Sequence, residues 1–460
     1  MSGAAGGPKS REAILGAPIQ STLFRLAWPA MAAALLGESQ TFISMFWIGR
    51  LLGEMGLATL GVVAPVFTTL GLIAGAAHIG VQVLTARSAG SGDGKAIPII
   101  VNGGYLGLAW GLAVTLVGLV ALGPISRALA GTLDIAGTLR PYLFVWLLFH
   151  ALPVVSGVAI FAVNATGWTR FGMIQSIVSI GLLVVLMPLF VGALHLDLVG
   201  VALSDGCSDV ILLVLTCYAL YRFRGDLGLG TLRRRDWRLD VALWREILHV
   251  GLFFQFARGM DIIAQVALVR VIMGSGQAAV AGYGLARFVI TMAMSAVGCL
   301  SPAAGIMIGQ NVGAGNAARA KACLRIAVTW LAVLGAALIA LGTSPGPVVR
   351  IFTDNDQVVV QTTEAIRALR WVIPAGMMSG ALLRAYTAVS PNKLGNSISI
   401  GCAVLTIVMA NAWPGAPLAS VAVAMITSQY LRLGLLVALY RRLFSSAILR
   451  RTAATYTGTH

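Results

Sequence analysis

Long apolar stretches alternate with short polar breaks along almost the whole chain. Each stretch is near the ~20 residues that a helix needs to cross the hydrocarbon core of a bilayer. The longest polar break, residues 222–245, is too short for a soluble domain. The pattern predicts an all-α integral membrane protein of about twelve transmembrane helices, near residues 21–48, 57–84, 97–122, 141–163, 171–194, 198–221, 247–272, 278–308, 322–344, 365–389, 394–413 and 417–440.

The composition supports this class. Of the 460 residues, 58% are hydrophobic and 10% are charged, whereas a soluble domain is about 25% charged. A soluble chain this apolar could not cover its surface, so the bilayer is the expected solvent. The first 20 residues show no charged, apolar and cleavage regions in series, and we therefore expect no removable signal peptide.

Lys and Arg residues gather at alternate connections between the predicted helices. With a cytoplasmic N-terminus, 21 of them lie at cytoplasmic ends and 6 at the opposite ends. The positive-inside rule then predicts a multi-pass protein of a bacterial-type inner membrane, with both termini cytoplasmic. This topology also explains the net charge of +16. Because no basic face is interleaved with aromatic residues outside the spans, we expect no nucleic-acid partner.

Two segments of the chain, 47–92 and 267–315, carry the same features in the same order. An offset near 220 in a chain of 460 residues indicates two tandem copies of about six helices each. An even number of helices keeps the copies parallel in the membrane, as in transporters whose substrate site lies at the repeat interface. The matching pairs are Arg50 with Arg270 and Gly56 with Gly276 at an offset of 220, the glycine turns at Gly92 and Gly315 at 223, which one indel of three residues reconciles, and Pro153 with Pro374 at 221.

The linker between the two copies is basic and carries a helical pattern at its end. Trp237, Val241, Trp244 and Leu248 recur at helical spacing, which favours an interfacial amphipathic helix over 236–248. A solvated basic linker is the alternative. The predicted division is an N-lobe at 1–221, a cytoplasmic linker at 222–246, a C-lobe at 247–445 and a cytoplasmic tail at 446–460.

Prolines inside the apolar stretches are candidate bend points. Each one removes a backbone hydrogen bond and kinks its helix. In lipid the freed carbonyl then needs a partner from a neighbouring helix or from cavity water. We expect helix bending at Pro29, Pro153, Pro188 and Pro374.

Four short stretches carry a family resemblance through their order and spacing. They are the SMFWIGRLLG run at 44–53, GWTR at 167–170 followed by MPL at 187–189, VGVAL at 199–203 and GQNVGAGN at 309–316. With the helix count, the set resembles the multidrug and toxic compound extrusion (MATE) family of transporters over nearly the whole chain.

The resemblance implies two pseudo-symmetric six-helix lobes that form a V-shaped cavity. It also implies secondary active export, in which an organic drug or metabolite leaves in exchange for H⁺ or Na⁺ by alternating access. No cofactor is expected besides this coupling ion. The partners that the resemblance implies are a small-molecule organic substrate and the lipid bilayer, and the family suggests a monomer.

The chain departs from the family where the N-lobe coupling residues are expected. Ser44 stands at the family's acidic position in the first helix. Ile180, Leu183 and Met187 stand at its asparagine and aspartate positions in the fifth helix. The resemblance therefore leaves the usual N-lobe ion network without its polar residues.

Three other carboxylates in the N-lobe lie within predicted spans. Charge is costly in lipid, so such residues mark either function or a compensated pair. Asp205 and Asp209 lie one turn apart on one face of the sixth helix, and two carboxylates so close cannot both ionise cheaply. With Glu38 in the first helix, they are candidates to replace the missing N-lobe acids. The alternative is that an aspartate lies near the headgroups or pairs with an arginine.

Asp261 is the acidic candidate in the C-lobe. Its spacing from Gly251 resembles that of a helix 7 acid in one branch of the family, which implies ion or substrate coupling. Arg258, three residues earlier on the same face, is a competing structural partner. Few acids balance the arginines of the C-terminal spans, and if several face the cavity they favour an anionic ligand. These arginines are Arg258, Arg270, Arg287, Arg384 and Arg432.

Four functions fit a chain of this class to different degrees. An antiporter for an organic compound is favoured over a flippase for a lipid-linked saccharide or anionic lipid, because twelve spans are predicted rather than fourteen. An intramembrane enzyme is disfavoured, since no His-Glu-x-x-His or Gly-x-Ser-x-Gly motif is present. A selective channel is disfavoured because no filter-like run is visible. The five cysteines lack metal-ligand spacing, and we expect no catalytic residue and no metal site.

Overall fold

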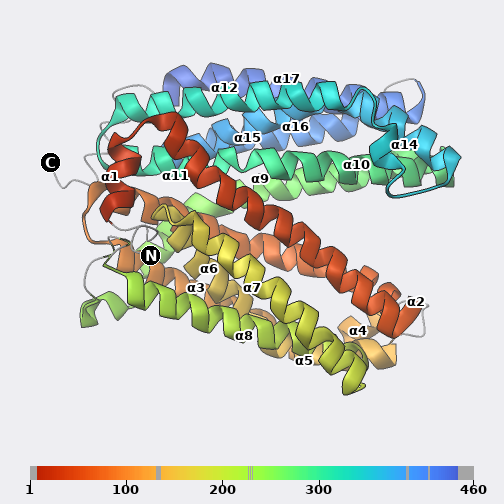
Figure 1. Cartoon of the computed structure of the whole chain (residues 1–460), viewed down its shortest axis with the longest axis horizontal. Coiled ribbons are helices and arrows are strands. Elements are labelled where there is room, and N and C mark those ends of the chain that lie inside the picture. The colour runs from red at the N-terminus through yellow and green to blue at the C-terminus, as the bar shows by residue number, and fades with distance from the viewer. Residues whose placement is uncertain are drawn as a thin grey trace. The chain divides into compact units, whose positions relative to one another are not determined.

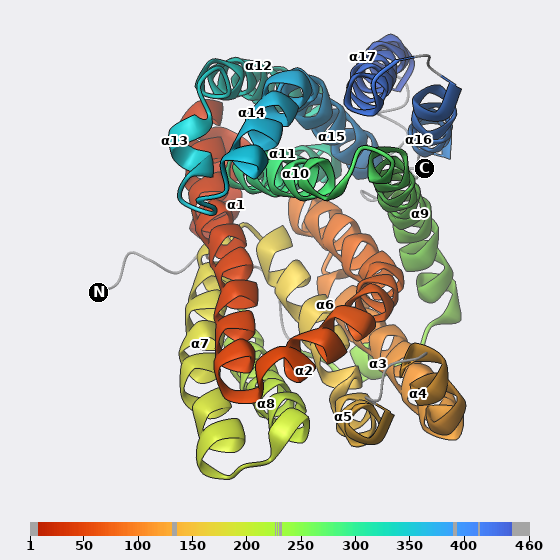
Figure 2. The ribbon, with the colours of Figure 1, turned by 90° about the vertical axis from the view of Figure 1, so that its right-hand side faces the viewer.

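Helices are the only regular structure in the part of the chain that the computed structural model describes, which comprises residues 8–130, 136–225, 227, 229, 232–389, 393–412 and 415–443. The chain divides into two compact units (Figures 1 and 2). The N-terminal unit comprises Met1–Ile14 and Ala32–Leu252, and the C-terminal unit comprises Leu15–Met31 and Phe253–His460.

The helices follow one another with short connections. Up to the linker they are α1 (Pro8–Gly16), α2 (Ile19–Ser91), α3 (Ala96–Val120), α4 (Leu122–Ala130), α5 (Ala136–Phe149), α6 (Ala151–Ala165), α7 (Thr169–Met187), the π-helix η1 (Pro188–Ala193) and α8 (Asp197–Phe223). From the linker onward they are the 3₁₀ helix η2 (Arg234–Trp237), α9 (Val241–Met273), α10 (Gln277–Gly298), α11 (Leu300–Gly313), α12 (Ala317–Leu341), α13 (Gly346–Val349), α14 (Asp356–Leu369), α15 (Val372–Val389), α16 (Lys393–Ala412) and α17 (Pro417–Leu443).

Most of these helices have the length and apolar character of membrane spans. Within the described residues nine helices are long and apolar enough to cross a bilayer, and a tenth span is the bent pair α5 and α6. One of the nine, α2, has 73 residues and leaves helical geometry at Gly53, so it supplies two spans. The 33-residue α9 carries Arg258 and Asp261 and completes the series. With α2 divided and α9 included, the described chain has the predicted twelve spans.

The internal repeat is visible in the lengths of equivalent helices. α3 and α12 each have 25 residues, α5 and α14 each have 14, and α8 and α17 each have 27. In each half, moreover, one span is broken into two helices at the same place, between α5 and α6 and between α14 and α15. The two halves therefore share a helical plan as well as a sequence pattern.

Glycines with left-handed backbone conformation mark equivalent points in the two halves. Gly53 and Gly276 have φ of 65° and 93°, and Gly92 and Gly315 have φ of 72° and 75°. Glycine adopts this conformation without a steric penalty, so the positions are conformational landmarks. Both pairs are 223 residues apart. Gly53 therefore corresponds to Gly276, whereas the sequence pattern had matched Gly56, and no indel is needed between these landmarks.

Three of the four predicted bend prolines lie at breaks in their helices. Pro153 and Pro374 are each the third residue of the second segment of a broken span, and the α5–α6 pair is bent by 41°. Pro188 begins the π-helix that follows α7. A first-turn proline costs little, since its missing N–H would have no helical partner there. The bend predicted at Pro29 is not seen, because α2 leaves helical geometry only at Gly53.

The beginning of α2 packs within the C-terminal unit, although the predicted N-lobe included it. The Phe24 ring contacts the Trp330 ring of α12 edge to face, with centroids 5.0 Å apart. The Arg319 guanidinium, also on α12, donates to the carbonyl of Ala17. The boundary between the units falls between Met31 and Ala32, within α2 itself.

Close backbone contact joins the start of α9 to α2 inside the N-terminal unit. A Cβ atom added at Gly251 would lie 1.8 Å from the carbonyl oxygen of Ala76. One added at Gly80 would lie 2.2 Å from the carbonyl oxygen of Ile247. Glycine is therefore required on both helices at this crossing, as in other close helix pairs in membranes.

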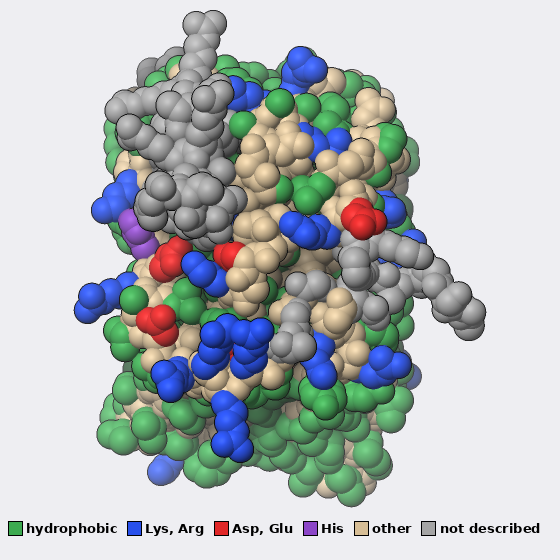
Figure 3. Space-filling model, turned by 90° about the vertical axis from the view of Figure 1, so that its left-hand side faces the viewer, with side chains coloured by type: hydrophobic (Ala, Val, Ile, Leu, Met, Phe, Trp, Pro, Cys, Tyr) green, Lys and Arg blue, Asp and Glu red, His purple; other side chains and the backbone are tan. Residues whose placement is uncertain are grey.

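The linker is fixed to α3 and does not form the interfacial helix expected over 236–248. The Asn102 side chain donates to the carbonyl of Arg238 and accepts from the N–H of Asp240, which holds 238–240 outside a helix. The Asp240 carboxylate then caps the first turn of α9 by accepting from the N–H of Ala242 and Leu243. The remaining linker arginines are exposed, and Lys and Arg predominate among the charged side chains on the face shown in Figure 3.

Candidate functional site

The C-terminal unit encloses a cavity of about 370 Å³ with a partly polar lining. Side chains from α9, α10, α15, α16 and α17 form its walls. The charged groups among them are Arg258, Asp261, Arg384 and Arg432. The cavity thus gathers ionisable groups from four helices inside a segment that spans the membrane.

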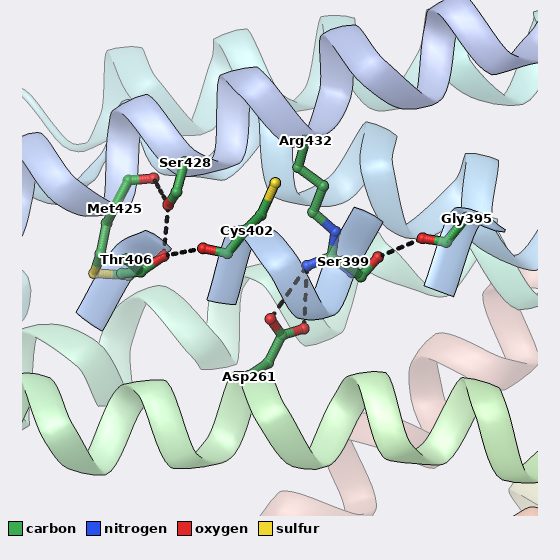
Figure 4. Close-up of polar contacts among 8 residues, drawn as sticks. All are labelled: Asp261, Gly395, Ser399, Cys402, Thr406, Met425, Ser428 and Arg432. Atoms are coloured by element: carbon green, nitrogen blue, oxygen red, sulfur yellow. Dashed lines mark hydrogen bonds and ion pairs between the residues drawn. The ribbon is translucent and has the colours of Figure 1, made fainter. Parts of the chain in front are cut away.

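An ion pair crosses this cavity between α9 and α17 (Figure 4). The Arg432 Nη1 atom lies 3.1 Å from Oδ2 and 3.3 Å from Oδ1 of Asp261. Arg432 is 7% exposed, while the Asp261 side chain is 30% exposed. The sequence suggested Arg258 as a structural partner, but among the described residues the ion pair of Asp261 is with Arg432, 171 residues away.

The other two arginines of the cavity have no ion-pair partner among the described residues. The Arg384 guanidinium lies over the ring of Phe254, with its carbon 5.3 Å from the ring centroid. Such a cation–π contact provides part of the stabilisation lost on leaving water. With three guanidinium groups and one carboxylate, the cavity has a formal charge of +2.

Hydroxyl and amide groups complete the polar side of the cavity. The Thr406 hydroxyl lies 2.7 Å from that of Ser428 and donates to the Cys402 carbonyl, which links α16 to α17 (Figure 4). Two buried atoms in the lining, Nε of Arg432 and Oε1 of Gln429, have no hydrogen-bond partner within the described chain. Buried polar atoms are normally paired, so both atoms are free to bind a ligand or water.

The N-terminal unit encloses a second cavity of about 370 Å³, which has an apolar lining. Aromatic residues form much of it, and the rings of Phe67 and Trp146 stack with centroids 3.8 Å apart. No charged residue lines this cavity. Leu183 and Met187, at polar positions of the MATE pattern, are buried in the neighbouring hydrophobic core.

The acidic candidates of the N-terminal unit lie outside this apolar cavity. Asp205 and Asp209 are half-buried on α8, within electrostatic range of each other, and Asp205 is also within range of Tyr142 on α5. Neither aspartate forms an ion pair in the described chain. Glu38 and Ser44 are half-buried on α2, and no contact joins Glu38 to either aspartate among the described residues.

The offset between the repeats adds a relation that sequence reasoning missed. At the 223-residue offset of the positive-φ glycines, Glu38 is the counterpart of Asp261. Arg432, the partner of Asp261, was named only as one of five arginines. The positive-φ glycines were the signal for the first relation, and no local sequence pattern could have found the second.

Comparison with known proteins decides the family. The MatE family model matches residues 29–189 and 260–412, one segment in each half of the chain. The chain belongs to the MATE family. It is therefore a membrane transporter and not an enzyme, as the resemblance implied. In the described residues, no group of three His, Cys, Asp or Glu could hold a metal ion.

Relatives of this MATE protein carry several transport functions. A FAD transporter of Shewanella oneidensis is 24% identical over 76% of this chain and 78% of its own. The multidrug export protein MepA of Staphylococcus haemolyticus is 22% identical over 75% and 76%. A probable multidrug resistance protein NorM of Halalkalibacterium halodurans is 24% identical over 64% of each chain.

Solved structures confirm the fold. A MATE protein in the bent conformation has a TM-score of 0.87 at 21% identity, and the match covers 97% of this chain and 100% of that one. A transporter of the MOP superfamily from Pyrococcus furiosus, whose binding pocket is described as having reverse polarity, has a TM-score of 0.82 at 19% identity over 95% and 99%. The all-helical multi-span fold is thereby confirmed, while the V-shaped cavity stays a prediction.

Proposed function

We propose that this MATE protein is a secondary active antiporter that exports an organic compound in exchange for H⁺ or Na⁺ by alternating access. The observation that carries the proposal is the charged cavity of the C-terminal unit. Ionisable side chains inside a membrane are costly and are kept where substrates or ions pass. Asp261 and Arg432 form such a site between α9 and α17.

We assign substrate binding to the C-terminal cavity and ion coupling to the acids of the N-terminal unit. The C-terminal cavity has the volume and the mixed polar and apolar lining of a small-molecule site. Glu38, Asp205 and Asp209 are the carboxylates available in the other unit, where the family's usual positions are apolar or carry Ser44. Separate sites allow the ion and the substrate to favour different conformations.

Helix bending is the proposed route between conformations. Related MATE structures are described in bent and in straight conformations. In this chain α2 passes from the C-terminal to the N-terminal unit two residues after Pro29. A proline at this point lacks one helical hydrogen bond, so bending there costs less than elsewhere in the helix.

We place the protein in a bacterial-type inner membrane, as a monomer with both termini in the cytoplasm. The excess of Lys and Arg at alternate connections supports this orientation. The exposed arginines of the linker, Arg233, Arg234, Arg235 and Arg238, would then face anionic headgroups of the cytoplasmic leaflet.

A flippase for an anionic or diphosphate-linked lipid is the second candidate. The observation that favours it is the formal charge of +2 in the C-terminal cavity, because guanidinium groups pair well with phosphate. The relative that transports FAD, itself a diphosphate, is consistent with a phosphate-bearing substrate but not with a lipid one.

Transport by the purified protein in proteoliposomes tests the antiport proposal. Efflux is followed for an anionic and a cationic dye, under an imposed pH gradient and separately under a sodium gradient. We expect efflux of at least one dye under one gradient, and its loss in Asp261→Asn. If no gradient drives efflux of either dye, while labelled phospholipid moves between leaflets, the flippase replaces the antiporter.

A further inference from the structure

The cavity of the C-terminal unit carries more positive charge than nearby acids can balance. Residues 253–460 contain four acidic residues, and Asp261 is the one that lines the cavity. The other three, Asp354, Asp356 and Glu364, are exposed, and Asp356 is paired with Arg350 at 2.9 Å. Arg258 and Arg384 therefore lack a compensating carboxylate within the described residues of this unit.

The form of the uncompensated charge restricts the ligand that would neutralise it. A guanidinium presents several N–H donors in a plane, and this geometry matches the oxygens of a phosphate or carboxylate. Arg432 uses Nη1 for Asp261, while its buried Nε has no partner in the described chain. One edge of the Arg432 guanidinium is thus occupied by protein and another is available.

We propose that this cavity binds a phosphate-bearing organic anion of about two negative charges, held by Arg258, Arg384 and Arg432, with Arg432 shared between the ligand and Asp261. The inference rests on the proposed function and names the substrate class of the same site. It also reverses the charge of the drugs that multidrug exporters usually carry. A cation would meet three arginines and one carboxylate that is already paired.

The remaining walls of the cavity suit the organic part of such a ligand. Phe254, Met294 and Leu383 supply apolar surface, and Gly376 and Gly380 leave room beside them. The volume of about 370 Å³ lies at the lower end of the range for small-molecule sites. The ligand would therefore be a compact molecule with one polar end.

The ion pair gives the proposal a sign that a cation site would not share. In an anion site Asp261 competes with the ligand for Arg432 and repels it. Replacing the carboxylate by a neutral amide should then strengthen anion binding. In a cation site the same change would remove the attractive group and weaken binding, so the direction of the effect separates the two.

Binding of flavin mononucleotide (FMN) and riboflavin to the purified full-length protein in detergent provides the test. The two compounds share one fluorescent ring system and differ by a phosphate monoester. We expect FMN to bind at least about tenfold more tightly than riboflavin, a difference that corresponds to about 1.4 kcal/mol. Asp261→Asn should increase FMN affinity by several-fold while leaving riboflavin affinity unchanged.

Arginine variants connect this preference to the cavity. Arg432→Gln and Arg384→Gln should each remove most of the difference between FMN and riboflavin. Arg258→Gln, at an exposed position and therefore tolerated by the fold, should reduce it. Arg270→Gln is the matched control, because Arg270 is exposed on the same helix as Arg258 and does not line the cavity. Thermal unfolding and gel filtration verify that each variant is folded.

Two competitors distinguish the sources of the phosphate. Short-chain phosphatidic acid carries the phosphate on a lipid, and phosphatidylcholine of the same chain length is its zwitterionic control. Displacement of FMN by phosphatidic acid far below the concentration at which phosphatidylcholine acts, in an arginine-dependent manner, supports the site with a lipid source. FMN preference without such displacement supports a soluble organic phosphate.

Equal binding of FMN and riboflavin, with no preference for phosphatidic acid, would overturn the proposal. So would a preference for FMN that survives in folded Arg432→Gln and Arg258→Gln, or weaker FMN binding in Asp261→Asn. None of these measurements requires transport. Failure of the transport function therefore appears separately, as FMN binding in a protein that moves no solute under any gradient.

Discussion

The two units enclose cavities of equal size but opposite character. The N-terminal cavity is lined by Val63, Phe67, Trp110 and other apolar residues, whereas the C-terminal cavity holds three arginines and an aspartate. The helices that surround the two cavities follow the same plan, with equal lengths for three equivalent pairs. The repeat thus maintains the scaffold, while the side chains that face inward have diverged.

Charge is also divided unequally between the equivalent helices of the two repeats. Glu38 on α2 and Asp261 on α9 are counterparts, but the partner helices differ. α8 carries Asp205 and Asp209, whereas the equivalent α17 carries Gln429 and Arg432. One repeat is therefore acidic and the other basic, which is why we assign cation coupling to the first and an anionic substrate to the second.

Removal of the Asp261 carboxylate should produce the largest loss of stability. Asp261→Ala leaves Arg432 buried without its partner, and breaking a buried pair costs about 3–5 kcal/mol. Since the Asp261 side chain is 30% exposed, we expect the lower end of this range. Thermal unfolding in detergent measures the effect. The double exchange Asp261→Arg with Arg432→Asp should recover much of the loss, and a double variant no more stable than the single one would contradict the pairing.

The positive-φ glycines test whether the repeats are conformationally equivalent. Gly53→Ala and Gly276→Ala should each destabilise the protein by about 1–2 kcal/mol, because a Cβ atom is strained in this backbone region. Gly284→Ala is the control, since no atom lies within 4 Å of its added Cβ and its φ is not positive. Thermal unfolding compares the three variants. A clear loss at one landmark only would show that Gly53 and Gly276 are not equivalent.

Asp209→Asn should separate coupling from substrate binding. With the acidic repeat as the ion site, gradient-driven transport should fall by about tenfold, which corresponds to about 1.4 kcal/mol in the barrier. Affinity for the substrate in the C-terminal cavity should not change. Flux under imposed pH and sodium gradients, beside equilibrium binding, provides both values. Full coupling in the variant would remove Asp209 from the ion site.

Trp110→Phe should have the smallest effect. The indole N–H of Trp110 faces the apolar cavity and has no hydrogen-bond partner in the described chain. Its removal relieves an unpaired donor and slightly enlarges the cavity, so these contributions oppose each other. We expect a change in unfolding free energy below about 1 kcal/mol. A larger loss, seen by thermal unfolding, would indicate that the indole N–H binds a ligand or water.

The helical plan could be predicted from sequence because it depends on local patterns. Apolar stretches of fixed length gave the twelve spans, and the repeated order of Pro153 and Pro374 anticipated the two broken spans. The linker helix failed, because Asn102, more than 130 residues away, holds residues 238–240 outside a helix. Long-range side-chain contacts of this kind leave no local signal.

The candidate site was only partly predictable for the same reason. Asp261 stood out as a carboxylate in an apolar stretch, and Arg258 was its nearest arginine in sequence. The actual partner, Arg432, comes from the last helix and depends on how α9, α16 and α17 pack. The equivalence of Glu38 and Asp261 required backbone angles, since the glycines that establish the register differ from those that the residue pattern matched.

The opposite character of the two repeats is tested most directly by one chemical change made at both counterparts. FMN binding and gradient-driven transport are measured for Asp261→Asn and Glu38→Gln side by side. We predict that Asp261→Asn binds FMN more tightly than the unmodified protein, whereas Glu38→Gln binds FMN normally and loses coupling to the gradient. Weakened FMN binding in both variants, or unchanged behaviour in both, would contradict the assignment of anion and cation sites to different repeats.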